Sequence, residues 1–263
     1  MTETLQEINA VLQSYFDKVL VLTVPRFKDR QEKVKQRLQG IQFDFFYGFD
    51  KQDLTESLIR EQYHYNKKNT LAPGYYFKPL NSGEIACSLS HRMIYQAMID
   101  HQWNKVLVLE DDVVPDEQEL AALESCLQEL PADWDLFYLG YLKNNQLTTG
   151  KKWQNAWYQL LALIGLSKMP LKMVKNRLPK NFSPHLWKAG FHDCTHAYAV
   201  SLNGAKKLLA AQTPVTYRAD NLLSALVLKE ELNAFASKKF LFNQEVFTDH
   251  TDRSHIREKW ANQ

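Results

Sequence analysis

Three consecutive acidic residues, Glu110, Asp111 and Asp112, directly follow the apolar run 106–109. A short run of Val and Leu bounded by polar residues is typical of a buried strand in an α/β sheet, and such sheets bind their ligands at the carboxyl ends of the strands. Because side chains alternate along a strand, an extended chain would point Glu110 and Asp112 one way and Asp111 the other. At least two carboxylates could then hold a hard cation, Mg²⁺ or Mn²⁺.

The acidic triplet also has an ordinary alternative interpretation. Acidic residues after a strand often solubilise a loop or interact with a helix N-terminus, and Pro115, Asp116 and Glu117 have the composition of a first helical turn. Three acids directly at the tip of a buried strand favour the metal site over this alternative. Taken alone, the triplet would suit a glycosyltransferase, a phosphatase or a nuclease.

Two other parts of the sequence carry groups suited to phosphate. The strand predicted at 18–24 leads into a basic loop, in which Arg26 and Arg30 would suit a nucleotide diphosphate; the start of a solvated helix face explains these arginines equally well. Asn81 and Glu84 have the spacing of a capping box at the start of a long helix. A helix N-terminus also suits a phosphate, but capping by the helix's own side chains is the default interpretation.

Acidic and histidine residues of the second half of the chain extend the set of candidates. Asp220 precedes the apolar helical stretch 222–228, where an acid is an ordinary N-cap and is also a rigidly held candidate for a general base. His196, on the strand predicted at 194–200, is more typical of a core histidine than of a ligand. The tail 247–255 contains residue types that bind metals, at a spacing that is not diagnostic.

The elements that must position these residues alternate between strands and helices. The predicted strands are 18–24, 42–49, 106–109, 135–139 (ended by Gly140) and 194–200. Amphipathic patterns between them predict helices, and this alternation favours an α/β fold with a mostly parallel sheet flanked by helices. A chain of 263 residues is long enough for one large α/β domain or two small ones.

The composition changes in the stretch 143–192, which holds nine Lys or Arg residues and no Asp or Glu, although the whole chain has a formal net charge of +2. Trp and Leu residues lie among these basic residues, and this combination favours a helical insertion that contacts an anionic membrane surface or an anionic acceptor. A buried helix pair with snorkelling lysines is a close alternative. Binding to nucleic acid ranks last, because no nucleic-acid-binding module is recognisable.

Cysteine usage and the apolar runs indicate where the protein works. Cys87, Cys126 and Cys194 are widely spaced and form no CxxC pair, so they suggest a reducing compartment and buried packing roles rather than disulfides or a zinc knuckle. The segment 1–17 lacks the basic start and the apolar core of a signal peptide. No apolar run approaches the ~20 residues of a membrane span. We expect a cytoplasmic protein, free or peripheral on the cytoplasmic face of the inner membrane.

In this order and spacing, the motifs resemble glycosyltransferase family 25, which includes galactosyl- and glucosyltransferases of lipopolysaccharide and lipooligosaccharide biosynthesis. The gap between Gly-Glu-Ile-x-Cys-x-x-Ser-His, at 83–91, and Glu-Asp-Asp, at 110–112, carries most of the resemblance. Ala86 stands where family members commonly have Gly, a mild departure. Further matching segments are 21–30, 135–140, 195–205 and 219–220.

The resemblance implies a GT-A-like catalytic domain spanning 1–263. Its activity would be the transfer of a hexose from UDP-galactose or UDP-glucose to a lipopolysaccharide or lipooligosaccharide core acceptor, with inversion and with Mn²⁺ or Mg²⁺. The cation would neutralise the leaving diphosphate, and a carboxylate would take the proton of the acceptor hydroxyl. Asp220 is the first candidate for this base and Asp193 the second.

The resemblance also assigns roles to the other candidates. Glu110 and Asp112 match the metal-binding acids, and Asp111 would face the sugar. The residues that match the nucleotide pocket are Arg26, Asp29, Arg30, Gly83, Glu84, Ser90 and His91.

Two rival functions would use the same sequence features. A metal-dependent phosphoesterase would hydrolyse phosphate esters with these acids and need no sugar acceptor. A non-catalytic membrane- or glycan-binding domain would rely on the basic aromatic stretch, and its binding would survive Asp112→Asn. The transferase interpretation instead predicts metal-dependent binding of a UDP-sugar, and a loss of activity with folding preserved in this variant.

Overall fold

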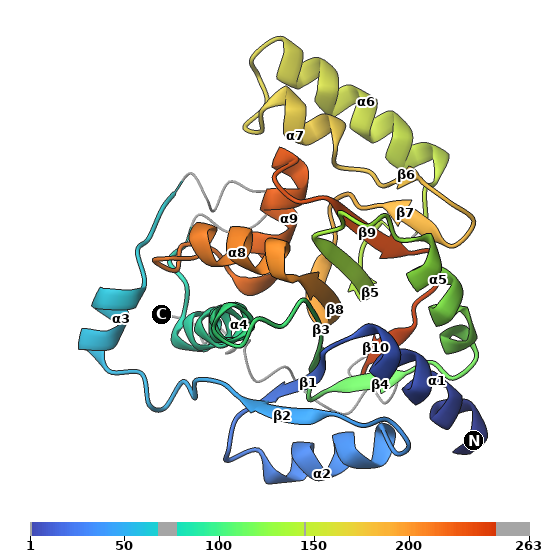
Figure 1. Ribbon diagram of the computed structural model, residues 1–263. Coiled ribbons are helices and arrows are strands. Elements are labelled where there is room, and N and C mark those ends of the chain that lie inside the picture. The colour runs from blue at the N-terminus through green and yellow to red at the C-terminus, as the bar shows by residue number, and fades with distance from the viewer. Residues whose placement is uncertain (1, 68–77, 145, 246–263) are drawn as a thin grey trace.

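The computed structural model describes residues 2–67, 78–144 and 146–245, so the tail 247–255 lies outside the described residues. Its centre is an eight-stranded sheet (Figure 1). The strands are β1 (Lys18–Thr23), β2 (Asp44–Tyr47), β3 (Lys105–Glu110), β5 (Leu136–Leu142), β6 (Lys180–Asn181), β7 (Leu186–Lys188), β8 (Asp193–Ser201) and β9 (Ala234–Ser237). Their order across the sheet is β2-β1-β3-β8-β5-β9-β7-β6.

The sheet is mixed but mostly parallel. β1 pairs in parallel with both β2 and β3, and β5 pairs in parallel with β9. β8 lies between β3 and β5 and is antiparallel to both, so β3 and β5 point the same way. The strands β1, β2, β3, β5 and β9 therefore share one direction. This confirms the predicted α/β, GT-A-like architecture.

Helices cover both faces of the sheet (Figure 1). One core contains residues of α1 (Thr2–Tyr15), α2 (Lys28–Arg37) and α5 (Leu123–Glu129). The other contains residues of α4 (Ser82–Asp100), α8 (Leu202–Ala211) and α9 (Ala219–Lys229), and α3 (Glu56–Gln62) lies at the periphery.

The two-sided burial explains the apolar strands in the sequence. Val19 and Val21 of β1 belong to one core, whereas Leu20 and Leu22 belong to the other. Successive side chains of a strand point to opposite faces. A strand covered on both sides therefore needs a continuous apolar run rather than an alternating one.

Two expected boundaries were wrong. β5 does not end at Gly140 but continues to Leu142, with irregular pairing to β8; a Cβ at Gly140 would collide with the ring of His196 and the carbonyl of Phe242, so this glycine permits a close approach. Pro115 does not open a helix. It ends β4 (Val113–Pro115), which pairs with the distant β10 (Phe242–Gln244), and a 3₁₀ helix follows at Glu119–Ala122.

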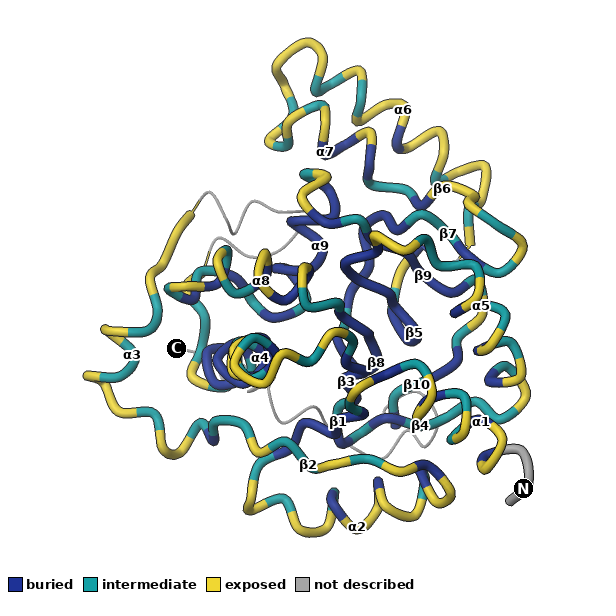
Figure 2. The backbone as a smooth tube through the Cα atoms, in the orientation of Figure 1, coloured by how far each residue is buried: buried dark blue, intermediate teal, exposed yellow. Residues whose placement is uncertain are grey.

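The stretch 143–192 contains two helices, α6 (Thr149–Leu163) and α7 (Leu171–Lys175), and also supplies β6 and β7, which were not expected. α6 projects beyond the sheet at the top of Figure 1 and is exposed along most of its length in Figure 2. A buried helix pair is therefore wrong for α6, where Trp153 is 74% exposed. Among the described residues, no helix combines the length and apolar character needed to cross a bilayer.

Candidate active site

A pocket of about 500 Å³ opens where β1 and β3 end. Most of the candidates from the sequence meet there, although they come from four separate parts of the chain. Those that line the pocket are Arg26, Arg30, Gly83, Glu84, Ser90, Glu110, Asp111, Asp112 and Asp220. Asp29, His91 and Asp193 are not among the lining residues.

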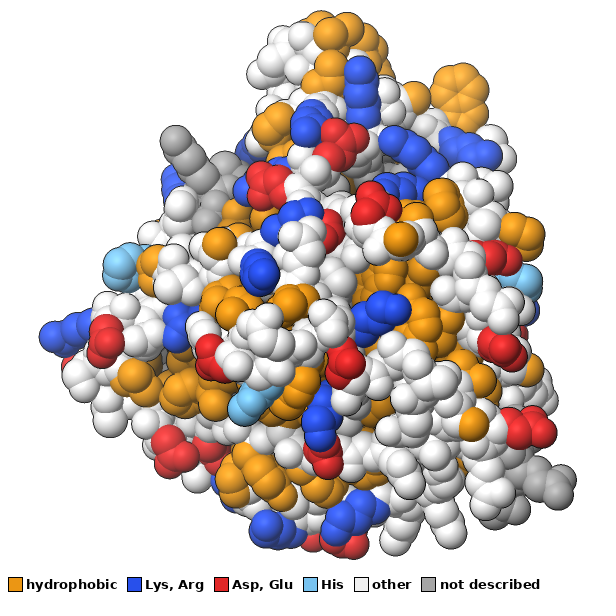
Figure 3. Space-filling view, in the orientation of Figure 1, with side chains coloured by type: hydrophobic (Ala, Val, Ile, Leu, Met, Phe, Trp, Pro, Cys, Tyr) orange, Lys and Arg blue, Asp and Glu red, His pale blue; other side chains and the backbone are white. Residues whose placement is uncertain are grey.

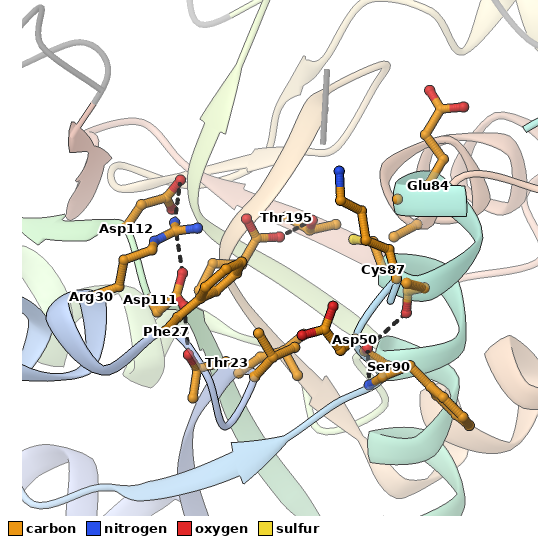
Figure 4. A pocket seen from close by; sticks show the side chains of 18 of the residues that line it. Thr23, Phe27, Arg30, Asp50, Glu84, Cys87, Ser90, Asp111, Asp112 and Thr195 are labelled. Atoms are coloured by element: carbon orange, nitrogen blue, oxygen red, sulfur yellow. Dashed lines mark hydrogen bonds and ion pairs between the residues drawn. The ribbon is translucent and has the colours of Figure 1, made fainter. Parts of the chain in front are cut away.

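The acidic triplet turns as it leaves the sheet. Pairing between β1 and β3 ends with Leu22 opposite Glu110, and the chain then turns before β4. Asp111 and Asp112 consequently face the same guanidinium group: Nη2 of Arg30 lies 2.6 Å from Oδ1 of Asp111 and 3.3 Å from Oδ2 of Asp112 (Figure 4). The expected opposite orientation of these two acids was wrong, because strand alternation does not continue past the last paired residue.

Each acid has a polar contact of its own. The Thr23 hydroxyl donates to Oδ2 of Asp111 at 2.6 Å, and the Gln244 amide donates to Oδ2 of Asp112 at 3.2 Å. The Thr195 hydroxyl donates to the carboxylate of Glu110. Residues of β1, β10 and β8 thus hold Asp111, Asp112 and Glu110, in that order.

The charge of Asp112 is poorly compensated, whereas that of Glu110 is stabilised by its neighbours. Burial and the nearby charges of Glu110 and Asp111 raise the pKa of Asp112 to about 7, against the opposing effect of Arg30. Burial also acts to raise the pKa of Glu110, but the proximity of His91 and Thr195 outweighs it and holds that pKa below its usual range. A divalent cation would relieve the repulsion, and these oxygen donors are those that Mg²⁺ and Mn²⁺ prefer. The donor chemistry of these residues therefore suits the implied metal.

The start of α4 forms the second wall of the pocket. The predicted capping box is present: the Glu84 backbone N–H donates to Oδ1 of Asn81 at 2.9 Å, and that of Asn81 donates to Oε2 of Glu84 at 3.0 Å. Glu84 also lies 3.2 Å from Nε of Arg218. The buried Ser90 hydroxyl accepts from Phe49 N at 2.9 Å, and so ties the segment after β2 to α4.

The arginines after β1 are paired with carboxylates at the pocket. Arg26 forms an ion pair with Asp50, and its guanidinium lies 4.6 Å from the ring centroid of Phe27. Arg30 bridges two acids, as described above. Asp29 is exposed in the first turn of α2 and does not line the pocket.

The two candidate bases have different surroundings. Asp220 lies in the first turn of α9 and lines the pocket, with its Oδ1 accepting from Asn221 N at 2.8 Å. Burial raises the pKa of Asp220. Asp193 is at the start of β8, where its Oδ2 lies 2.5 Å from Nζ of Lys143. Asp220 therefore lines the same pocket as the acidic cluster, whereas Asp193 does not.

Both candidate histidines are buried. Nδ1 of His91 lies 2.8 Å from the Tyr198 hydroxyl, and Nε2 lies 3.4 Å from Oε1 of Glu110. This ring therefore contacts Glu110 without lining the pocket. His196 is a core residue, as expected, with Nε2 3.3 Å from the Phe242 carbonyl. Burial lowers the pKa of His196.

Sequence reasoning missed several pocket residues. Cys126 is buried as expected, but Cys87 and Cys194 line the pocket, so a pure packing role is wrong for these two. Arg218 could have been found, because it is the N-cap of α9, two residues before Asp220. Thr195 could not, because its contact with Glu110 depends on the unpredicted pairing of β8 with β3.

The sheet has a GT-A-like architecture, with the acids at the end of β3 in the pocket. The chain belongs to glycosyltransferase family 25: the model of this family, described as "LPS biosynthesis protein", matches residues 16–223.

Curated relatives include animal proteins of the same family. Procollagen galactosyltransferase 2 of Mus musculus is 30% identical over 205 residues, which cover 74% of this chain and 28% of the relative. Inactive glycosyltransferase 25 family member 3 of Homo sapiens is 31% identical over 209 residues, 75% of this chain and 29% of the relative. Procollagen galactosyltransferase 1-B of Xenopus laevis is 28% identical over 211 residues, which cover 75% of this chain and 28% of the relative. The chain thus spans less than a third of the length of these relatives.

Proposed function

We propose that this protein is a metal-dependent, inverting glycosyltransferase that transfers a hexose from a UDP-sugar to an acceptor hydroxyl. The observation that carries the proposal is that Glu110, Asp112 and Asp220 line one pocket at the carboxyl edge of the sheet. Membership of family 25 supports glycosyl transfer, and the names of the procollagen galactosyltransferases favour galactose over glucose as the donor sugar.

The residues of the pocket divide the chemistry between them. Mn²⁺ or Mg²⁺ held by Glu110 and Asp112 would supply a Lewis acid for the leaving diphosphate. Arg26 and Arg30, which line the pocket, would exchange their carboxylate partners for phosphate oxygens. The Asp220 carboxylate would take the proton from the acceptor hydroxyl, and its raised pKa makes it a stronger base than an ordinary Asp.

The proposed acceptor is a lipopolysaccharide or lipooligosaccharide core sugar, and the proposed site of action is the cytoplasm. The description of the family as a lipopolysaccharide biosynthesis protein supports this acceptor. The names of the animal relatives point to procollagen instead, so procollagen is the natural competing acceptor.

The test is a transfer assay with labelled UDP-galactose or UDP-glucose, Mn²⁺, and either truncated lipooligosaccharide or procollagen. We expect label in the lipooligosaccharide, lost on chelation of the metal. Label in procollagen alone would overturn the acceptor. Hydrolysis of phosphate esters without transfer to any acceptor would instead favour the phosphoesterase.

We further propose that α6 binds an anionic membrane surface. Exposed Trp and Leu side chains of the α6 region include Trp153, 74% exposed, and Leu163, 70% exposed. Figure 3 shows apolar side chains at the surface of this projection, with Lys and Arg side chains nearby. The absence of Asp and Glu from 143–192 makes the surface complementary to anionic headgroups.

Vesicle binding tests this contact. We expect the protein to bind vesicles rich in phosphatidylglycerol but not vesicles of phosphatidylcholine. Replacing Trp153 and Trp157 by Ala should weaken binding at least about tenfold, because each substitution removes apolar area that the bilayer would bury. Tyr47→Ala removes an aromatic that is 46% exposed on β2 and should leave binding unchanged. Equal binding by the double variant would overturn the proposal.

A further inference from the structure

Cys87, His91 and Glu110 form a compact cluster at the pocket, with one potential ligand atom from each residue within 4.8 Å of the others. Cys87 and His91 are four residues apart on α4, so their side chains lie on one face of that helix. Glu110 is the last residue of β3. Figure 4 shows Cys87 on α4 close to Thr195, across the pocket from Asp111 and Asp112. The glycosyl transfer proposed above gives Cys87 no role.

The surroundings of His91 resemble those of a metal-binding histidine. The ring is buried, and Nδ1 lies 2.8 Å from the Tyr198 hydroxyl, which in turn lies 3.2 Å from that of Tyr95. If Nδ1 donates to Tyr198, the lone pair of Nε2 faces Glu110. Within the described part of the chain, Nε2 makes no hydrogen bond of good geometry. Histidines that bind metals usually have their other ring nitrogen fixed in this way.

The distances suit a tetrahedral ion. With Zn–N and Zn–O bonds of about 2.0–2.1 Å, tetrahedral geometry separates the nitrogen and oxygen ligands by about 3.3 Å. Nε2 of His91 and Oε1 of Glu110 are 3.4 Å apart. The Cys87 sulfur is within 4.8 Å of both, so it has to approach by at most roughly 1 Å for a Zn–S bond of about 2.3 Å. The Thr195 hydroxyl already holds the Glu110 carboxylate in place.

We propose that Cys87, His91 and Glu110 bind Zn²⁺, with the fourth position open to the pocket. Thiol and imidazole ligands select Zn²⁺ over Mg²⁺ and Mn²⁺, which prefer the oxygens of Glu110 and Asp112. On binding, the Cys87 thiol releases its proton to solvent and its sulfur forms the bond to zinc. Because both sites use Glu110, zinc and the hard cation exclude each other. Zinc is therefore an inhibitor of the transferase, a consequence that rests on the proposed function.

Co²⁺ is the probe that tests the binding site, because thiolate ligation gives an absorption band that oxygen ligands do not give. We expect the full-length protein to show the thiolate-to-cobalt band and to lose it on titration with Zn²⁺. Cys87→Ser should abolish the band. Cys194→Ser removes another pocket thiol and should keep it. No band in the wild type, or a band that persists in Cys87→Ser, would refute the site.

Two further measurements keep the outcome clear. Cys87→Ala serves as a second variant, and circular dichroism establishes that each variant is folded before cobalt is added. In the transfer assay, Zn²⁺ should inhibit the wild type at a concentration at least about tenfold lower than Cys87→Ser, as expected when one of three ligands is lost. Cobalt binding does not depend on the proposed activity. A failure of the transferase proposal would therefore not refute the metal site, and a failure of the metal site would not refute the transferase proposal.

Discussion

Asp112 and Asp220 are both carboxylates whose pKa is raised mainly by burial, but their neighbours differ. Asp112 lies among other acids and shares Arg30 with Asp111, so a bound cation would stabilise its negative charge. Asp220 lies at a helix start near Arg218, 4.0 Å away, and accepts a backbone hydrogen bond. These surroundings favour metal binding for the first residue and proton transfer for the second.

Replacing Asp112 should separate binding from folding. Asp112→Asn removes a buried negative charge, so we expect metal-free protein to gain about 1 to 3 kcal/mol of unfolding free energy. Mn²⁺ affinity should fall by at least about tenfold, since a ligand is lost. Calorimetric titration and urea unfolding measure both effects. Glu117→Gln, which removes an acid outside the pocket, is the control. Unchanged Mn²⁺ affinity in Asp112→Asn would refute the assignment.

Replacing Asp220 should slow the reaction without weakening donor binding. Loss of a general base typically costs about 10² to 10⁴ in rate, so kcat of Asp220→Asn should fall by this range. The loss of kcat should be smaller in Asp193→Asn, which breaks the ion pair with Lys143 and removes a charge that raises the pKa of Asp220. Equal losses in the two variants would contradict the choice of base.

The pH profile of the wild type gives a second test of Asp220. The raised pKa means that the carboxylate becomes protonated, and inactive as a base, at a higher pH than an ordinary Asp. As pH falls, kcat should therefore decline on a limb centred above the usual range of a carboxyl pKa. A limb at the ordinary Asp value would argue against a buried Asp220 as the catalytic base.

At the scale of elements, local patterns predicted the parts of the site that single segments form. The ends of β1 and β3 and the capped start of α4 followed from apolar runs and a capping box. Contacts between distant segments could not be predicted, because local composition does not determine which strands pair. Thr195 contacts Glu110 across 85 positions, and Gln244 contacts Asp112 across 132.

Gly140 tests the close packing of β5, β8 and β10. Gly140→Ala should cost about 1 to 3 kcal/mol of unfolding free energy, because the added Cβ meets the His196 ring and the Phe242 carbonyl. Gly150→Ala is the matched control in α6, where the nearest atom is 4.0 Å away, and it should be neutral or gain up to about 1 kcal/mol. Urea unfolding measures both. A stable Gly140→Ala protein would contradict the contact.

At the scale of the whole molecule, buried histidines link stability to pH. Burial lowers the pKa of His192 to about 4, from its ordinary 6.5, so the folded protein keeps this ring neutral. Its contribution to stability is complete above pH 6.5 and is lost as pH falls towards 4. Asp112 acts in the opposite sense, because its raised pKa adds stability as pH falls through about 7.

A comparison with His192→Gln isolates the histidine, because the contribution of Asp112 is common to both proteins. Between pH 7.5 and pH 5, the unfolding free energy of the wild type should fall by about 2 kcal/mol relative to the variant. Urea unfolding at the two pH values gives this difference. An equal pH dependence in the two proteins would show that His192 is not held neutral by burial.

Thermal unfolding with Mn²⁺ and nucleotide sugars tests the central claim, that Glu110 and Asp112 bind a cation together with a UDP-hexose. A ligand that binds only the folded state stabilises it by about 2.7 kcal/mol at a concentration one hundred times its Kd. We predict a rise in Tm with UDP-galactose or UDP-glucose that requires Mn²⁺, is absent with GDP-hexoses and disappears in Asp112→Asn. No rise with either UDP-hexose, or a rise that persists in Asp112→Asn, would contradict the account.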